Sequence, residues 1–235
     1  MNYLDMGYLK LLLMRHAESL GNVQKIMEGQ SSTALSNKGQ QQASQLAQAL
    51  LSSSERPAYL YSSPLLRARQ TAEAISLLLA QSSHSFLYRE TDALKELHQG
   101  IFQGLTWVQA QAKYPELCER LMATLSWQTI PEAEPLPVAR TRAVAWTKYL
   151  LSHHAAGDVV WVVSHEGFLQ HLLSTVMGCD RTWQIRIPHT AIFEYWISLS
   201  NQAHSDADSN SYALEHFNPE HWIIRRFNDV SHLDT

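Results

Sequence analysis

Two short, nearly continuous apolar runs constrain this chain more than any other feature of its sequence. Residues 9–14 read LKLLLM and residues 159–163 read VVWVV. Such runs are typical of strands that are covered on both faces, as in parallel sheets. Both are far shorter than the roughly 18 residues that a membrane-spanning helix needs, so we expect no membrane partner. They predict two buried central strands.

Segments with helical periodicity alternate with the strand-like runs. Ser36 is expected to cap the first helix, Ser63 and Pro64 to open the second, and Gly178 to end the helix that contains Phe168 to Leu173. The apolar residues recur three and four positions apart, as on one buried helix face. These faces are expected at Ala43, Leu46, Ala47, Leu50 and Leu51, at Ala68, Ala72, Ile75 and Leu79, at Ala139, Ala143, Trp146 and Leu150, and at Phe168, Leu169, Leu172 and Leu173.

Further strands are predicted over residues 58–62, 86–89, 191–199 and 212–217, with a polar hairpin loop over residues 200–211. Alternation of strands and helices favours the α/β class, as a three-layer αβα sandwich with a mainly parallel, mixed central sheet. A length of 235 residues suits a single domain over residues 1–235. Helical residues 105–127, interrupted at Pro115, predict a small helical cap or lid at about residues 97–131.

The amino-acid composition limits the classes of partner and the cell compartment that we expect for this chain. The formal net charge of −4 argues against nucleic acid, because phosphate backbones are bound by clusters of Lys and Arg. The two cysteines, Cys118 and Cys179, are too few to staple a chain of this size. The first apolar run is too short for a signal peptide. We therefore expect a cytoplasmic protein with reduced thiols.

A histidine follows each of the two long apolar runs: His16 after the first and His165 after the second. The carboxyl ends of parallel strands share one edge of a sheet, where α/β proteins bind ligands, so the imidazoles converge if the strands are neighbours. Arg15 precedes His16, and Arg67 lies in the first turn of a predicted helix, where free N–H groups favour anions. Because a guanidinium group holds two oxygens at once, these residues predict a phosphate pocket.

The segment Arg15-His16-Ala17-Glu18-Ser19 closely resembles the signature of the histidine phosphatase superfamily, also called the phosphoglycerate mutase-like family. The resemblance continues in order along nearly the whole chain, which argues against a chance match. Further matching segments are Asn22, Gly29 with Leu35-Ser36 and Gly39, Ser62-Ser63-Pro64 with Arg67-Ala68-Arg69, Leu94 to Glu96 with Gly100, Glu134 with Arg142, and Val162-Val163-Ser164-His165-Glu166-Gly167.

The resemblance implies a metal-independent phosphomonoester hydrolase that needs no cofactor and acts on a small-molecule phosphomonoester. His16 would be the nucleophile that becomes phosphorylated, and Glu96 would protonate the leaving alkoxide and then deprotonate water. The phosphate would be bound by Arg15, Arg67, His165 and Asn22. Ser32 and Glu166 depart from the family pattern, and we expect them at the pocket entrance, where they would bear on the choice of substrate.

Alternatives remain open. The segment 94–104, which carries Glu96, resembles the family's loop for its acid and is called the acid loop here. A cofactor-dependent phosphoglycerate mutase of this family would carry an additional insert after the acid loop, which the short stretch 105–137 does not contain. A non-catalytic binding or regulatory member would usually lack His16 or Glu96. The substrate, whether a sugar phosphate, a nucleotide-like phosphate or a phosphoamino acid, is expected to be set by residues 97–131. Three aromatic residues there form either an apolar lid or core packing of the cap: Trp107, Tyr114 and Trp127.

Overall fold

A six-stranded sheet with the order β3-β2-β4-β1-β5-β6 forms the centre of the molecule. The computed structural model describes residues 7–53, 55–82, 84–124, 130–179, 181–182, 184–199 and 222–233. Neighbouring strands are parallel from β3 to β1, whereas β5 is antiparallel to β1 and to β6. The mixed, mainly parallel sheet predicted from the sequence is confirmed. Its strands are β1 (Tyr8–Arg15), β2 (Tyr59–Ser62), β3 (Leu87–Glu90), β4 (Val159–Ser164), β5 (Ile192–Ser198) and β6 (Ile223–Asp229).

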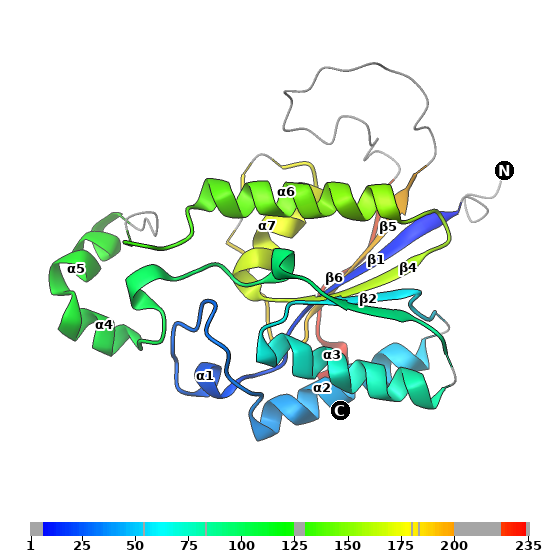
Figure 1. Cartoon of the computed structure of the whole chain (residues 1–235), viewed down its shortest axis with the longest axis horizontal. Helices are drawn as coiled ribbons and strands as arrows, with labels where there is room; N and C mark the ends of the chain where they lie inside the picture. Colours follow the sequence, from blue (N-terminus) through cyan, green and yellow to red (C-terminus); the bar gives the residue numbers. More distant parts are fainter. Residues whose placement is uncertain are drawn as a thin grey trace, which may run out of the picture.

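Helices cover both faces of this sheet (Figure 1). Alternate residues of one strand face opposite sides, so β1 contributes to two cores. Leu11 packs in the core that includes residues of α6 and α7, whereas Met14 packs in the core that includes residues of α2 and α3. The sheet and the helices on its two faces therefore form three layers. The helices are α1 (Leu20–Val23), α2 (Asn37–Ser52), α3 (Leu66–Gln81), α4 (Trp107–Lys113), α5 (Pro115–Thr124), α6 (Leu136–His153) and α7 (Glu166–Val176), with short 3₁₀ turns at Asp92–Leu94, Gly100–Phe102 and Ser231–Leu233.

Helix α2 begins where the sequence predicts. The Ser36 hydroxyl accepts a hydrogen bond from the N–H of Gly39 at 2.9 Å, which satisfies one of the free donors of the first turn. Gly39 also lets the chain pack closely here, because a Cβ at this position would lie 1.9 Å from the carbonyl oxygen of Glu18. This contact ties the start of α2 to the loop that follows β1.

Helix α3 begins later than predicted. Its first residue is Leu66, so the expectation that Ser63 caps it and Pro64 occupies its first turn is wrong. The reason is tertiary: the Ser63 hydroxyl lies 2.7 Å from Nε2 of His165, and Ser32 accepts the N–H of Leu66 at 2.7 Å from a distant loop. Ser32 therefore caps a helix, and its expected place at the pocket entrance stays a prediction.

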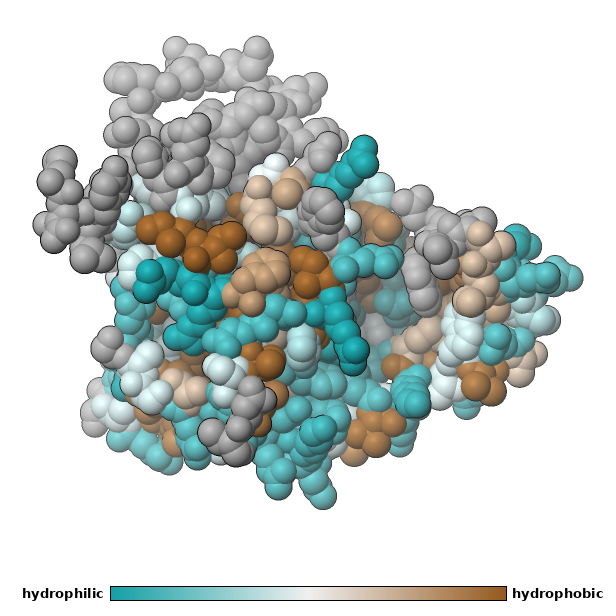
Figure 2. Space-filling view, turned by 180° about the vertical axis from the view of Figure 1, so that it is seen from behind, coloured by the Kyte–Doolittle hydropathy of each residue, from teal (hydrophilic) through white to brown (hydrophobic). Residues whose placement is uncertain are grey.

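Helices α4 and α5 lie within the segment predicted as a cap, and they project from one side of the sheet and its covering helices (Figures 1 and 2). Pro115 is the first residue of α5, where a missing N–H does no harm. Trp107 and Tyr114 pack against Phe102, with ring centroids 6.3 and 6.0 Å apart. This geometry favours cap packing over a lid for both residues. Trp127 lies outside the described residues.

The C-terminal part differs from expectation. Strand β6 was not predicted; it pairs at the sheet edge and its side chains are largely exposed, so the apolar alternation that reveals a half-buried strand is weak. The predicted strand over residues 212–217 and the loop over residues 200–211 lie outside the described residues. Among the helices that the structure describes, none is both long and apolar enough to cross a bilayer.

Candidate active site

His16 and His165 meet at the carboxyl edge of the sheet. Strands β1 and β4 are parallel neighbours, with Arg15 opposite Ser164, and each histidine follows its strand directly. The two ring centroids are 5.0 Å apart, and both side chains are buried. The convergence predicted from the sequence is therefore confirmed.

Two hydrogen bonds define the protonation of His16. Its Nδ1 lies 2.7 Å from the carbonyl oxygen of Ala17, which can only accept, so Nδ1 carries the proton. Its Nε2 accepts the Nε–H of Arg67 at 3.2 Å. Burial lowers the pKa of His16 well below its usual value, and the positive charge of Arg67 lowers it further. The ring is therefore neutral at pH 7, with its lone pair on Nε2.

Arg67 is almost completely buried and is held by backbone carbonyls. It lies in the first turn of α3, as predicted, and its two terminal nitrogens donate to the carbonyl oxygens of Ser31 and Gly29, each at 2.8 Å. The loop over residues 28–33 thus fixes the plane of the guanidinium group. Only a planar fork can reach these two carbonyls and His16 together.

Arg15 and His165 each present a buried nitrogen that has no hydrogen-bond partner among the described residues: Nε of Arg15 and Nδ1 of His165. The rest of each side chain is anchored. Arg15 contacts a Glu166 carboxylate oxygen at 2.8 Å and the Ile187 carbonyl oxygen, and Nε2 of His165 lies 2.7 Å from the Ser63 hydroxyl. Nδ1 of His165 is a donor in the tautomer whose Nε2 accepts the Ser63 hydroxyl proton. Buried donors normally have partners, so in that tautomer the two free nitrogens indicate a place for an acceptor such as a phosphate oxygen.

Glu96 caps the start of α7. One carboxylate oxygen accepts the N–H groups of Leu97 at 2.8 Å and Phe168 at 3.0 Å, and the other accepts the N–H of Gly167 at 3.1 Å. A Cβ at residue 167 would lie 2.6 Å from the first oxygen, so glycine leaves room for the carboxylate. The helix start and the acid loop are thereby locked together.

Arg142 of α6 holds the acid loop from behind. It makes a two-pronged contact with Glu134, at 3.0 and 2.9 Å, as the spaced pair in the sequence suggested. Its third nitrogen donates to the carbonyl oxygens of Ala93 at 3.0 Å and Lys95 at 2.7 Å. These carbonyls lie three residues and one residue before Glu96, so Arg142 sets the path of the backbone that carries Glu96.

The predicted catalytic and phosphate-binding residues other than His165 line one small cavity of about 160 Å³. The ring of His165 lies next to the ring of His16, which does line the cavity. The cavity receives side chains from loops after β1 and β3 and from the starts of α3 and α7. It is lined by Arg15, His16, Asn22, Ile26, Met27, Glu28, Gly29, Arg67, Glu96, Gln99 and Glu166.

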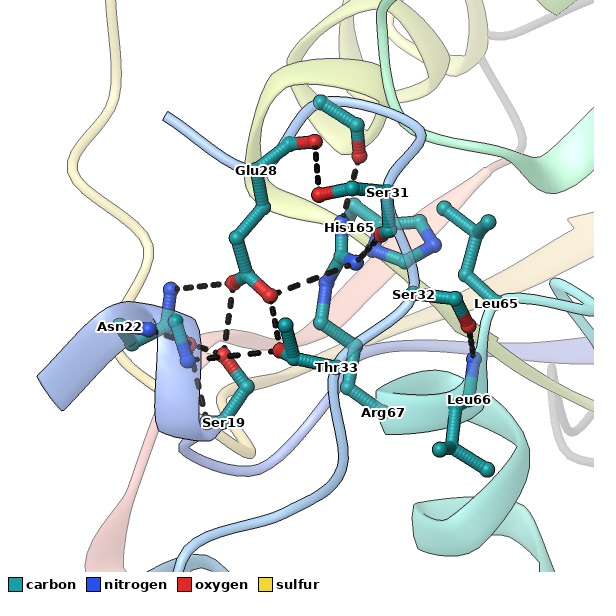
Figure 3. A network of polar contacts seen from close by, with 12 residues as sticks. Ser19, Asn22, Glu28, Ser31, Ser32, Thr33, Leu65, Leu66, Arg67 and His165 are labelled. Atoms are coloured by element: carbon teal, nitrogen blue, oxygen red, sulfur yellow. Dashed lines mark hydrogen bonds and ion pairs between the residues drawn. The ribbon is translucent and has the colours of Figure 1, made fainter. Parts of the chain in front are cut away.

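Sequence reasoning missed Glu28, which organises one wall of this cavity (Figure 3). Its carboxylate accepts the Ser19 hydroxyl at 2.6 Å, the Asn22 amide at 3.0 Å and the Thr33 hydroxyl. It also lies 3.7 Å from a terminal nitrogen of Arg67. The only available signal was its place next to the motif residue Gly29.

The room for Glu28 comes from a glycine on α1. A Cβ at Gly21 would lie 2.4 Å from the carboxylate carbon of Glu28, so any side chain at residue 21 would displace it. No motif used in the sequence analysis includes Gly21. Its importance depends on a contact between residues seven positions apart, which the sequence alone does not display.

His189 is a third histidine near the site, and sequence reasoning missed it as well. Its ring centroid lies 5.9 Å from that of His16, and its Nε2 lies 3.0 Å from the amide oxygen of Asn22. Burial lowers its pKa to about 3, with a further contribution from Arg15. The ring is neutral at pH 7 and can donate from Nε2, which turns the Asn22 amide nitrogen toward Glu28 and the cavity.

A family model described as "Histidine phosphatase superfamily (branch 1)" matches residues 11–203. The chain belongs to this superfamily. The match spans both histidines, Arg15, Arg67 and Glu96, and so includes every residue for which the sequence analysis expected a catalytic role.

Curated relatives of this member of the superfamily include phosphatases and mutases. The chain is 27% identical over 227 residues to the metal-independent phosphoserine phosphatase of Arabidopsis thaliana, covering 96% of this chain and 84% of the relative. It is 28% identical to phosphoserine phosphatase 1 of Hydrogenobacter thermophilus, covering 96% and 94%. It is 26% identical to the probable phosphoglycerate mutase GpmB of Photorhabdus laumondii, covering 97% and 96%.

Solved structures confirm the fold of the superfamily. The phosphoglycerate mutase of Bacillus anthracis superposes with a TM-score of 0.74 at 19% identity, covering 98% of this chain and 97% of that structure. A mycobacterial glucosyl-3-phosphoglycerate phosphatase superposes with a TM-score of 0.69 at 22% identity, covering 95% and 100%. At such identities the likeness establishes the architecture, and the activity has to be argued from the site.

Proposed function

We propose that this histidine phosphatase hydrolyses small phosphomonoesters through a phosphohistidine formed on His16. One observation carries the proposal: Nε2 of His16 holds an unprotonated lone pair in a cavity bordered by Arg15, Arg67 and His165. A neutral imidazole is a competent nucleophile toward phosphorus, and the guanidinium groups of Arg15 and Arg67 suit the oxygens of a phosphoryl group.

In the first step Nε2 of His16 attacks phosphorus and the bond to the ester oxygen breaks. Glu96 gives its proton to the departing alkoxide, so that an alcohol leaves. Oε2 of Glu96 accepts one N–H group, from Gly167, whereas Oε1 accepts two, from Leu97 and Phe168. Oε2 therefore has room for the proton. In the second step Glu96 removes a proton from water, the water oxygen attacks phosphorus, and phosphate leaves His16.

The cations of the site supply the electrostatic part of the catalysis. Arg15, Arg67 and the N–H of His165 would contact the non-bridging oxygens as charge moves onto them. One unit-charge contact at 4 Å contributes about 4 kcal/mol at an effective dielectric constant of 20. Because these groups are already anchored by Glu166, Ser31 and Ser63, little reorganisation is needed when the phosphoryl group arrives.

A trapping experiment tests the proposal. The protein is mixed briefly with a ³²P-labelled phosphomonoester and denatured in alkali, which preserves phosphohistidine. We expect label on the wild-type protein and none on the His16→Asn variant. Absence of label from the wild type, with no phosphate released under multiple-turnover conditions, would contradict the proposal and favour a binding or regulatory protein.

The mutase alternative has a separate test. The short stretch between the acid loop and α6 lacks the additional insert expected of a mutase, which favours hydrolysis. The protein is incubated with 3-phosphoglycerate and a trace of 2,3-bisphosphoglycerate. We expect slow release of phosphate and no 2-phosphoglycerate. Efficient conversion to 2-phosphoglycerate would overturn the phosphatase assignment while leaving the phosphohistidine step intact.

A further inference from the structure

A second and larger cavity adjoins the phosphate cavity. It has a volume of about 650 Å³ and shares Gln99 and Glu166 with the smaller one. Cavities of 300–1,000 Å³ typically bind small organic ligands, whereas 160 Å³ accommodates little beyond a phosphoryl group. Because the two cavities have Gln99 and Glu166 in common, we place the alcohol part of a phosphomonoester whose phosphoryl group lies near His16 in the larger one.

We propose that this alcohol is uncharged, rich in hydroxyl groups and about the size of a hexose. The inference rests on the proposed function and specifies its substrate class. Three kinds of observation support it: the volume just described, the charges around both cavities, and the hydrogen-bonding groups on the wall of the larger one.

The charges around the phosphate cavity oppose a second negative group. Two carboxylates line this cavity, from Glu28 and Glu166, together with Glu96, which is the protonated acid when the ester binds; they face the two guanidinium groups of Arg15 and Arg67. Both arginines are already engaged, Arg15 by Glu166 and Arg67 by two carbonyl oxygens and His16. A carboxylate on the leaving group would meet like charges at short range, which lowers affinity for such a substrate.

The larger cavity offers little positive charge that could offset this repulsion. Its acidic lining residues are Glu134, which Arg142 neutralises, and Glu166, which Arg15 neutralises. Arg186 is the one cation among the lining residues that the structure describes, and it is exposed. An exposed cation is screened by solvent and adds little to the binding of an anion.

Neutral hydrogen-bonding side chains line the same wall. Gln99, Gln170 and Gln184 border the cavity, and Nε2 of Gln170 is fixed by the carbonyl oxygen of Ile185 at 2.9 Å, which leaves its amide oxygen as an acceptor. Leu97 and Ile130 contribute apolar surface to the same cavity. Amide groups combined with apolar patches suit the hydroxyl groups and carbon faces of a sugar.

Matched substrate pairs test the proposal. The kcat/KM is measured for glucose 6-phosphate against 6-phosphogluconate and for glycerol 3-phosphate against 3-phosphoglycerate, with p-nitrophenyl phosphate as a reference. Glycerol 3-phosphate and 3-phosphoglycerate differ only by the carboxylate, whereas glucose 6-phosphate and 6-phosphogluconate differ by the carboxylate and by ring closure, so the three-carbon pair is the stricter comparison. We expect at least a tenfold preference for the uncharged member of each pair, and a higher kcat/KM for glucose 6-phosphate than for glycerol 3-phosphate.

The place of the alcohol is tested with Gln184→Trp, which narrows the larger cavity. We expect its kcat/KM ratio of glucose 6-phosphate to glycerol 3-phosphate to fall at least fivefold, whereas Val108→Trp, on the exposed face of the cap, leaves that ratio unchanged. Equal rates within the matched pairs, or a preference for 3-phosphoglycerate or phosphoserine, would overturn this inference alone. Failure to hydrolyse any ester, the p-nitrophenyl ester included, would overturn the proposed function itself.

Discussion

The Nε–H group of Arg67 donates to Nε2 of His16 across 3.2 Å, so the proposed nucleophilic atom is held by a positive neighbour. The contact depends on two distant segments: His16 follows β1, and Arg67 opens α3. It keeps the ring neutral, because a proton on Nε2 would face the guanidinium group directly. It also places a positive charge beside the point where phosphorus would bind.

Arg67→Lys should lower kcat/KM by about 10²-fold or more, in line with the loss of a preorganised donor. A lysine cannot contact Gly29, Ser31 and His16 at once, because its ammonium group is a single point. The measurement is steady-state hydrolysis of p-nitrophenyl phosphate. Arg69→Lys, two residues on and paired with Glu73 at the surface, is the matched control and should stay within twofold of wild type. Equal losses in the two variants would contradict the role of Arg67.

Glu28→Gln should strengthen the binding of inorganic phosphate, with a competitive inhibition constant lowered about threefold to tenfold, because one negative charge leaves the cavity. Glutamine keeps an acceptor for Ser19 and Asn22, so the wall should remain in place. The variant should also narrow the discrimination against 3-phosphoglycerate. An unchanged or higher inhibition constant, with an unchanged melting temperature, would show that Glu28 acts only as a structural residue.

Arg142→Ala should destabilise the protein by roughly 1–3 kcal/mol, because it removes charge-assisted hydrogen bonds to Glu134 and two backbone carbonyls. It should also lower kcat, since the acid loop loses its support. Chemical denaturation gives the first quantity and steady-state kinetics the second. A double-mutant cycle with Glu134→Ala should show coupling of the two residues. If the effects of the two substitutions on the free energy of unfolding simply add, the contact between Arg142 and Glu134 does not stabilise the fold.

The pH dependence of kcat/KM should lack an acid limb near pH 6.5. A free imidazole takes up a proton below about pH 6.5 and then has no lone pair for attack. In this protein burial and the charge of Arg67 lower the pKa of His16 well below that of a free imidazole. Burial also lowers the pKa of His165. The nucleophile therefore stays unprotonated at pH 6. The profile is measured with a substrate whose own ionisation is corrected for. A fall of kcat/KM with an apparent pKa close to 6.5 would contradict the protonation assigned to His16.

The stability of the fold should decrease as the pH falls below about 6.5. Burial keeps His171 and His189 neutral in the folded state, with pKa values of about 4 and about 3, while both take up protons in the unfolded chain near pH 6.5. The unfolded state then binds more protons, so each ring removes about 1.4 kcal/mol per pH unit, from below pH 6.5 down to its folded pKa. Denaturation at pH 7.5, 6 and 5 measures this slope. His171→Gln should reduce the slope by about one proton, and an identical slope in the variant would contradict the assignment.

Local sequence patterns predicted most of the regular structure. The apolar runs 9–14 and 159–163 became β1 and β4, and the spaced apolar residues from Ala43 to Leu50 became the buried face of α2. Their signals are strong because burial of one face imposes a period on the sequence. The start of α3 and the strand β6 escaped prediction, since the first depends on Ser32 and Ser63 contacting other elements, and the second lies at a solvent-exposed edge.

By itself the sequence determined the α/β class, the motif order of a histidine phosphatase, and the positions of His16, Glu96 and His165 at strand or loop ends. Each of these properties depends on residues that are close together in the sequence, so a short segment is enough to reveal it. Only the tertiary structure decided that Glu28 enters the cavity beside Arg67, that His189 supports Asn22, and that a larger cavity opens next to Glu166. Such contacts join residues far apart in the chain, and charge and hydrogen bonding act through space, so no local pattern records them.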